Sequence, residues 1–331
     1  MDAIAVSEPS QIGDARRSAV ALSTRLGFGQ TRVGEAGIVA TELATNLVKH
    51  GGGGQLLVGG YEDETGNGLE FLSLDQGQGM TNIAACLEDG YSTSGTSGTG
   101  LGAVGRLATV FDIWSQPGRG TALLARLAAR PAQRAGPQAR WGALSVAYPG
   151  ESVCGDGLRF SDSAEGFRMM VVDGLGHGIF AAEASNAAVR VFNQMPEASP
   201  TATVEAMHQA MHKTRGAAVG VARYVMGVPE IRFCGVGNIA GAIIQGDDMR
   251  RMVSHNGTIG HTAPRIRDFE YPVTAPFLMV MASDGLSTSW SLDQYPGLRG
   301  RHPVLIAGLL YRDFRRARDD VTVLVIRENG A

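Results

Sequence analysis

Residues 167–178 read FRMMVVDGLGHG, an apolar run that ends in Asp173 and a glycine-rich turn. The run has the length and composition of a strand that faces a protein core, so we expect Asp173 where this strand leaves its sheet. A core-facing strand that ends in Asp-Gly marks either a turn or a site at the rim of the sheet, and a single pair is most often only a turn. The surrounding sequence decides between these two interpretations.

Three further acidic positions in the second half of the chain are candidates for the same site, and two of them lie at the end or start of an apolar strand. Asp284 follows the apolar run FLMVMAS, Asp319 precedes the strand VTVLVI, and Asp156 lies in GESVCGDG. Carboxylates that meet at one rim would repel one another and raise each other's pKa unless a cation neutralised them. Oxygen ligands without His or Cys favour Mg²⁺ or Mn²⁺. Two such ions can lower the pKa of a shared water, which then attacks a phosphoester directly.

The pattern GD, DGxGHG, SDG and DDxT over about residues 142–328 resembles the PPM superfamily of metal-dependent Ser/Thr phosphatases, in its bacterial SpoIIE and RsbX branch. The segment GESVCGD is similar to RsbX in particular. The resemblance implies an α-β-β-α sandwich that holds two Mn²⁺ or Mg²⁺ ions, and that Asp320 is a neighbour of the metals rather than a ligand. For His177 we expect a place beside the ligands or a structural role, not metal binding. The implied ligands are Asp156, Asp173, Asp284, Asp319 and the backbone carbonyl of Gly174.

Recognition of the substrate phosphate stays open from sequence. Larger members of the superfamily use an arginine near the start of the domain, and none aligns here, which leaves Arg159 and Arg168 as candidate substitutes. A cysteine phosphatase built on Cys154 is disfavoured because the acidic Asp156 beside it opposes phosphate binding. Arg312, the first of four arginines near the end of the last predicted helix, is expected on a solvated face.

The first half of the chain contains a helix and a strand end with polar residues of a different kind. Glu42 and Asn46 are four apart on a helix expected to begin near Thr31, so they share a face. A carboxylate and an amide placed together can position water and Mg²⁺. Asp75 follows an apolar strand in the segment DQGQGM, where a carboxylate can accept a hydrogen bond from an exocyclic amine such as that of adenine.

Two glycine-rich segments follow. GTSGTGLGA at 95–103 precedes a predicted helix, and small residues before a helix form a cradle of N–H donors for an anion. PGRGT at 117–121 joins two predicted strands. Each of these segments, taken singly, is explained as well by a turn or by an ordinary polar helix face.

The order ELATN, DQGQG, GTGLG, GRGT resembles the GHKL ATPase family of histidine kinases, gyrases and anti-sigma-factor kinases, over nearly all of residues 10–128. ELATNLVKHGGGGQLLV looks especially like the RsbT serine kinases. The resemblance implies a Bergerat-type ATP-binding α/β sandwich in which Glu42 is the general base or orients water, Asn46 binds the Mg²⁺ of ATP or ADP, and Asp75 reads adenine. It also implies that Thr121 lies near the adenine and that five glycines shape a phosphate lid: Gly77, Gly79, Gly98, Gly100 and Gly102.

Length and composition agree with a two-domain α/β protein. The 331 residues suggest about two domains, and PAQRAGPQARW at 131–141 is the predicted linker between 1–130 and 142–331. A net charge of −3 argues against nucleic-acid binding driven by bulk charge, and three dispersed cysteines argue against a disulfide framework or a zinc site. We expect neither a secretory signal nor a membrane span, and therefore a cytoplasmic protein.

These features predict a bifunctional regulator of a bacterial partner-switching or stressosome pathway. The resemblances imply that one module phosphorylates Ser or Thr on a STAS-domain partner and that the other hydrolyses the phosphoester. An alternative is that the first domain is a non-catalytic, ATP-gated clamp on a sigma factor or STAS-domain protein. A further alternative is that ATP occupancy only regulates the phosphatase. A homodimer is expected by analogy alone.

Overall fold

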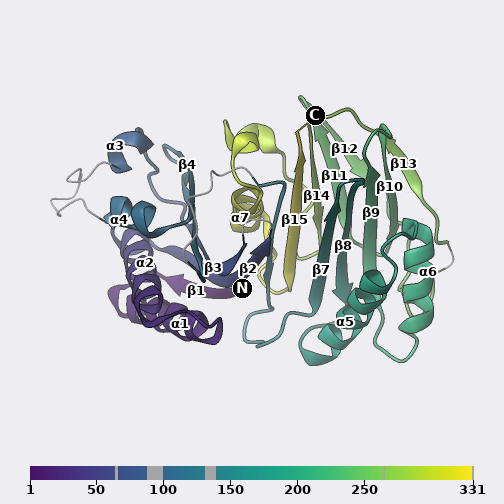
Figure 1. Ribbon diagram of the computed structural model, residues 1–331, viewed down its shortest axis with the longest axis horizontal. Coiled ribbons are helices and arrows are strands. Elements are labelled where there is room, and N and C mark those ends of the chain that lie inside the picture. The colour runs from purple at the N-terminus through teal and green to yellow at the C-terminus, as the bar shows by residue number, and fades with distance from the viewer. Residues whose placement is uncertain (64–65, 88–99, 131–138, 264, 330–331) are drawn as a thin grey trace. The chain divides into compact units, whose positions relative to one another are not determined.

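A computed structural model describes residues 1–63, 66–87, 100–130, 139–263 and 265–329 (Figure 1). Internal contacts divide the chain into two compact units. Unit 1 comprises Met1–Gln138 and Tyr295–Arg312, and unit 2 comprises Ala139–Gln294 and Asp313–Ala331. The predicted boundaries 1–130 and 142–331 therefore differ from these units, because residues 295–312 group with the first unit.

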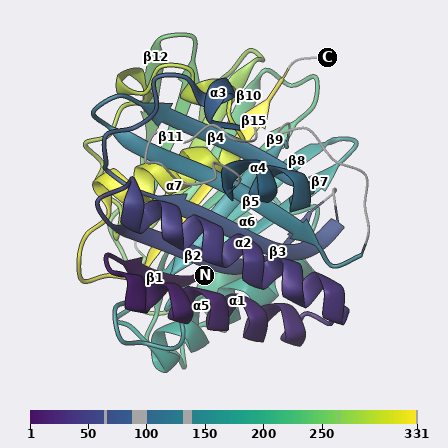
Figure 2. The same cartoon turned by 90° about the vertical axis from the view of Figure 1, so that its left-hand side faces the viewer.

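Unit 1 is built on an antiparallel sheet with strand order β1-β2-β3-β5-β4. Two long helices lie side by side across one face of this sheet (Figure 2). The strands are β1 (Asp2–Val6), β2 (Gly54–Asp63), β3 (Gly66–Leu74), β4 (Val110–Gln116) and β5 (Gly120–Ala128). The helices are α1 (Ile12–Arg25), α2 (Gln30–Lys49), α3 (Ile83–Leu87), α4 (Gly100–Leu107) and, from the later segment, α7 (Pro303–Phe314).

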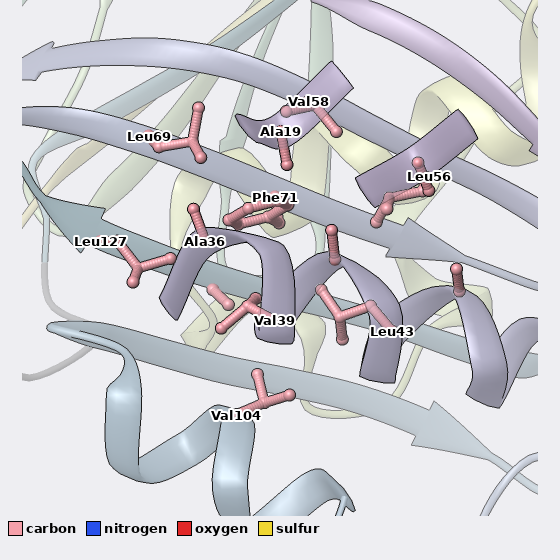
Figure 3. Close-up of a cluster of buried hydrophobic side chains, with 14 of the residues drawn as sticks. Ala19, Ala36, Val39, Leu43, Leu56, Val58, Leu69, Phe71, Val104 and Leu127 are labelled. Atoms are coloured by element: carbon pink, nitrogen blue, oxygen red, sulfur yellow. The ribbon is translucent and has the colours of Figure 1, made fainter. Parts of the chain in front are cut away.

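Helix α2 owes its position to an apolar stripe with helical spacing. Val39, Leu43 and Leu47 recur every four residues and are at most 1% exposed. They pack against side chains on the facing side of β2 and β3, such as Val58 and Phe71 (Figure 3). This cluster is the core of unit 1, and it holds the polar face of α2 in a fixed orientation.

The opposite face of the same sheet carries residues 295–312. A methyl group added at Gly308 of α7 would lie 3.1 Å from Leu72 Cδ2, on the side of β3 that points away from Phe71. The Asp112 carboxylate on β4 accepts a 2.7 Å hydrogen bond from the backbone N–H of His302 and pairs with Arg301 at 3.1 Å. A carboxylate at the start of a helix stabilises it, because it accepts hydrogen bonds from the free N–H groups and lies at the positive end of the helix dipole. Asp112 therefore anchors α7 to unit 1.

Unit 2 contains two antiparallel five-stranded sheets, with orders β13-β10-β9-β8-β7 and β12-β11-β14-β15-β6. Their strands are β6 (Trp141–Val146), β7 (Asp156–Ser163), β8 (Gly166–Gly174), β9 (Ala217–Val225), β10 (Glu230–Val236), β11 (Ala240–Gln245), β12 (Asp248–Met252), β13 (Phe269–Pro272), β14 (Phe277–Ala282) and β15 (Val321–Glu328). Helices α5 (Ile179–Gln194) and α6 (Pro200–Ala210) cover the first of these sheets (Figure 1).

The alternation of side chains along β8 explains this layering. Met169 and Val171 belong to the core between the two sheets, together with Met279 and Leu324 from the second sheet. Their neighbours Met170 and Val172 point to the other face, into the core beneath α5 and α6. Asp173 follows in the same alternation as Met169 and Val171, so its side chain points to the side of the sheet that faces the second sheet.

One expectation for the second half, the extent of the linker, differs from the structure. Of the predicted linker, residues 131–138 lie outside the described residues, whereas Trp141 already begins β6 and Arg140 pairs with Glu328 at 2.6 Å. The end of the linker is therefore part of a sheet. No helix in the described part of the chain is long and apolar enough to cross a membrane.

The core of unit 1 can be tested with two apolar truncations in α2. Leu43→Ala removes a side chain that is fully buried, whereas Ile38→Ala removes one that is 50% exposed. We expect a loss of unfolding free energy of about 2–5 kcal/mol for the first and under about 1 kcal/mol for the second, measured by urea unfolding. Equal losses would contradict the packing described.

Candidate functional site

In unit 1, Asp75 joins two of the predicted motifs. It lies directly after β3, and its Oδ1 accepts hydrogen bonds from the backbone N–H groups of Gly77 at 2.9 Å and Thr121 at 3.1 Å. Its own N–H donates to the Thr121 carbonyl at 3.0 Å. Burial raises the pKa of Asp75, and the two N–H donors oppose that rise. DQGQG and GRGT thus form one structure around a single carboxylate.

Two glycines allow these loops to approach so closely. Gly79 has φ +69°, and a Cβ there would lie 2.1 Å from the Gln116 carbonyl oxygen. Gly120 has φ +75°, and a Cβ there would lie 2.2 Å from the Asp75 carbonyl oxygen. Other residues rarely adopt this backbone conformation and would collide with the facing strand. Gly79 therefore lies where the two loops meet.

The polar face of α2 brings further predicted residues to this region. A Cβ at Gly100, the first residue of α4, would lie 2.5 Å from Glu42 Oε2, so the carboxylate lies against the start of that helix. Asn46 Nδ2 is buried and has no hydrogen-bond partner among the described residues. At the end of α2, a Cβ at Gly51 would lie 2.8 Å from Asp75 Cβ. The end of α2 therefore meets the loop of Asp75.

Two further glycines belong to the predicted lid, and the structure describes only one of them. Gly102 is buried within α4. Gly98 lies outside the described residues, so its predicted role stays a prediction.

In unit 2, the predicted acids lie at strand ends that meet. Asp156 begins β7 and stands directly opposite Asp173 in the antiparallel register with β8. Asp284 follows β14 and Asp319 precedes β15, at neighbouring ends of the second sheet. The Asp284 side chain is within hydrogen-bond reach of both Asp173 and Asp319. The four carboxylates thus share one rim.

Their charges interact strongly. Burial, followed by the charges of Asp156, Asp284 and Asp319, raises the pKa of Asp173 to about 9. Burial is also the main cause that raises the pKa of Asp156 to about 7 and that of Asp319 to about 6. A cluster of carboxylates with raised pKa values is a site where a cation would restore the charged forms.

The donor set suits a hard divalent ion. Asp156 Oδ2 is buried without a hydrogen-bond partner among the described residues, so it is available to a cation. Carboxylate oxygens dominate the rim, and oxygen ligands favour Mg²⁺ or Mn²⁺. Within the described ranges, no group of three or more His, Cys, Asp or Glu side chains is arranged so that it could hold a metal ion. The four carboxylates therefore lie at the same rim, but their side chains are not arranged around a single point.

Glycines shape the backbone at this rim. A Cβ at Gly174 would lie 2.1 Å from the Ala181 carbonyl oxygen, and a Cβ at Gly155 would lie 2.8 Å from Asp320 Oδ2. Only glycine fits where α5 and the Asp156 loop approach this closely. The glycine at 174 keeps its backbone beside Asp173, where the resemblance places a carbonyl ligand.

Asp320, His177 and Cys154 have other surroundings. Asp320 Oδ1 accepts a 2.8 Å hydrogen bond from the Tyr148 backbone N–H. His177 Nδ1 lies 2.7 Å from Glu151 Oε1, and its ring stacks on that of Tyr148 with 4.4 Å between centroids. Burial, with the nearby Asp156 charge, raises the pKa of the Cys154 thiol to about 12. A thiol that stays protonated is a poor nucleophile.

The two arginines proposed for phosphate do not face the acids. Arg168 lies beneath α5 and α6, with its Cζ 4.4 Å from the Phe192 ring centre and Nη2 donating to Thr203 at 3.1 Å. Arg159 pairs in register with Met170, whose side chain belongs to the same helix-covered core. Paired residues point to the same face of a sheet, so both arginines point away from the rim.

One neighbour of the acids was not anticipated. Asn238 Nδ2 donates to Asp284 Oδ2 at 2.5 Å. It lies in the turn between β10 and β11, where Gly237 has φ +89°. In the sequence, Gly-Asn between two strands indicates a turn, and nothing there shows which distant carboxylate it reaches.

Comparisons with known proteins match both units. A family model for the histidine kinase-like ATPase domain matches residues 5–127, and one for Stage II sporulation protein E (SpoIIE) matches residues 163–329. The chain is 36% identical over 104 residues to the serine/threonine-protein kinase RsbT of Bacillus subtilis (strain 168). That match covers 31% of this chain and 78% of RsbT.

Two solved structures share the fold. The PP2C phosphatase domain of the cell fate determinant SpoIIE from Bacillus subtilis, with a fragment of its regulatory domain, aligns with a TM-score of 0.50 at 16% identity, covering 96% of this chain and 93% of that one. A structure from the bacterial stressosome, a modular system adapted to control secondary messenger signaling, aligns at 0.53 and 24% identity, covering 57% of this chain and 98% of that one. At these identities they show the fold alone.

Proposed function

From the premise that this chain belongs to the SpoIIE family and carries a histidine kinase-like ATPase domain, we propose that it is a bifunctional regulator of protein phosphorylation. Unit 2 hydrolyses phosphoserine or phosphothreonine, and unit 1 transfers phosphate from ATP to Ser or Thr. The single observation that carries the phosphatase proposal is the meeting of four carboxylates at one rim. The partner we propose is a STAS-domain protein of a partner-switching system.

In the phosphatase, the chain's own residues would hold and orient the metals. Asp156, Asp173, Asp284, Asp319 and the carbonyl of Gly174 are the proposed ligands. Two divalent ions, when bound, neutralise phosphoryl charge and lower the pKa of water at the site. Asn238 fixes the Asp284 carboxylate through its 2.5 Å hydrogen bond. Asp320 holds the backbone after β6 through Tyr148 and is a positioning residue.

In the kinase, catalysis would depend on positioning and charge neutralisation. The Asn46 Nδ2 has no hydrogen-bond partner among the described residues. We propose that the side-chain oxygen of the same amide binds the Mg²⁺ of ATP. Glu42 lies at the start of α4, where we propose that it orients the attacking hydroxyl and accepts its proton. Asp75 would receive the adenine amine. The 36% identity to a serine/threonine-protein kinase supports transfer rather than mere binding.

The phosphatase assignment predicts the effect of Asp284→Asn. Loss of one ligand charge should lower Mn²⁺-dependent hydrolysis of a phosphoserine peptide at least about 100-fold. Mutation of residues that only support metal ligands already lowers metal affinity or activity about 10–100-fold. ATP binding by calorimetry should not change. Asp248→Asn, which changes an exposed acid in the same unit, is the control. Hydrolysis at the wild-type rate in Asp284→Asn would contradict the assignment of the phosphatase site to the acidic rim of unit 2.

The kinase assignment predicts transfer of label from γ-labelled ATP to a purified STAS-domain protein. Asn46→Ala should abolish both transfer and Mg-ATP binding, while Glu42→Gln should abolish transfer and keep binding. Thr45→Ala, which removes a hydroxyl bonded to the Thr41 carbonyl of the same helix, is the control. A stable complex that forms in ATP without any label transfer would instead establish the clamp.

A second candidate function, regulation of the phosphatase by ATP, is favoured by Arg312. Its Nη1 donates to the Asp75 carbonyl oxygen at 2.6 Å, so this arginine is not on a solvated face. The chain then continues into unit 2. There the Phe314 carbonyl accepts from Ser287 N–H at 2.9 Å, and Arg316 N–H donates to the Gly285 carbonyl at 2.7 Å. The chain from Arg312 to Arg316 therefore makes its first contact within unit 1 and its later ones within unit 2.

Regulation by ATP predicts that a non-hydrolysable ATP analogue changes the phosphatase rate. Arg312→Ala should remove that response because it cuts the link to Asp75. Arg316→Ala, which removes an exposed side chain and keeps the backbone hydrogen bond, should retain it. Identical rates with and without the analogue in the wild type would exclude this candidate.

A further inference from the structure

We propose that Arg215 binds the substrate phosphate, and that the apolar side chains of Leu175, Ile179 and Phe180 contact the polypeptide that carries it. This inference rests on the proposed phosphatase function of unit 2. It supplies the phosphate-binding cation that neither Arg159 nor Arg168 can provide.

Strand pairing brings Arg215 to the Asp173 loop. Asp173 stands opposite Ala218 and Gly174 opposite Ala217 in the antiparallel register of β8 and β9. Arg215, two residues before β9, therefore lies beside the residues that follow β8. The Leu175 N–H donates to the Gly216 carbonyl at 3.0 Å and holds the two segments together.

The guanidinium lies over that loop. A Cβ at Gly176 would lie 3.0 Å from Arg215 Nη1, and a glycine with φ +89° leaves this space open. Gly176 is three residues after Asp173, so the cation lies over the loop that leads away from the acidic rim. An arginine presents a planar set of N–H donors that matches two oxygens of a phosphate.

Phe180 holds Arg215 without occupying its donors. The Arg215 Cζ lies 4.8 Å from the centre of the Phe180 ring, a cation–π contact. Arg215 is exposed and forms no ion pair with any residue that the structure describes. Its N–H groups therefore remain available. A substrate phosphate brings two negative charges to the rim, and Arg215 complements the charge that the metals leave.

The apolar side chains around Arg215 indicate what carries the phosphate. Leu175 is 47% exposed, Ile179 is 64% exposed and Phe180 is 58% exposed, all within six residues of the loop and the first turn of α5. A patch of exposed apolar side chains marks an interaction surface. Because this patch is continuous with the Asp173 loop, its occupant is a phosphorylated polypeptide with apolar residues beside the phosphoserine or phosphothreonine.

Steady-state kinetics with Mn²⁺ test the cation. The probes are two phosphoserine peptides, one flanked by leucines and one by serines. Arg215→Ala should raise KM for both peptides, and the inhibition constant of inorganic phosphate, about 10-fold, because a charge-assisted hydrogen bond is lost. Its kcat should change less than about threefold. Arg215→Lys should restore part of the affinity, and Arg159→Ala, which removes another exposed arginine of unit 2, should match the wild type.

The apolar patch is tested with the same peptides. The wild type should have the lower KM for the leucine-flanked peptide, and Ile179→Ser should remove that preference while leaving phosphate inhibition unchanged. Calorimetric Mn²⁺ affinity should be the same in all variants, which a merely structural role of Arg215 would not predict. Unchanged KM and phosphate inhibition in Arg215→Ala, or a lost Mn²⁺ affinity, would overturn the inference. Absence of any wild-type hydrolysis would instead overturn the proposed phosphatase.

Discussion

Mutual repulsion among carboxylates is the constraint on which unit 2 depends. The register of β7 with β8 sets Asp156 against Asp173, and the core between the two sheets brings Asp284 and Asp319 to the same rim. Burial and the neighbouring charges together raise the pKa of Asp173 to about 9. Such an arrangement costs free energy while the carboxylates are charged, and the divalent ions proposed for this rim would reduce that cost on binding.

In unit 1 a single carboxylate, that of Asp75, holds two loops together. Asp75 accepts N–H donors from two loops and so holds the strand end and the GRGT turn together. The Arg312 side chain adds a third element by binding the carbonyl of the same residue. Residues 295–312 thus belong by contact to the nucleotide-binding unit although they interrupt the phosphatase sequence. The chain passes from unit 1 back into unit 2 directly after Arg312.

Much of the fold could be predicted because the strong elements carry clear periodicity. The helix of Glu42 and the strand of Asp173 were both expected from their apolar spacing, and acids at strand ends were expected to meet at a sheet edge. Strands β1, β12 and β13 would be hard to predict, because all three are edge strands, which bury little and show a weak apolar pattern. Helix α7 is buried from Pro303 to Tyr311, so its sequence presents no polar face that would show which unit it packs on.

Site residues whose contacts depend on the pairing of distant strands could not be predicted from the sequence. Arg215 and Asn238 each lie in a turn, and only the register of β8 with β9 and the proximity of β10 to β14 show what they approach. Arg312 was expected in solvent because a run of arginines at a helix end usually decorates a solvated face. The local sequence pattern predicts which helix, strand or turn carries a residue, whereas tertiary packing decides which residue its side chain contacts.

Anomalous diffraction from crystals grown with Mn²⁺ would test the central claim most directly. The account predicts Mn²⁺ peaks within about 2.0–2.6 Å of carboxylate oxygens of Asp156, Asp173, Asp284 and Asp319. Peaks located only elsewhere, such as beside His177 and Glu151, or crystals without any Mn²⁺ peak at this rim, would contradict it.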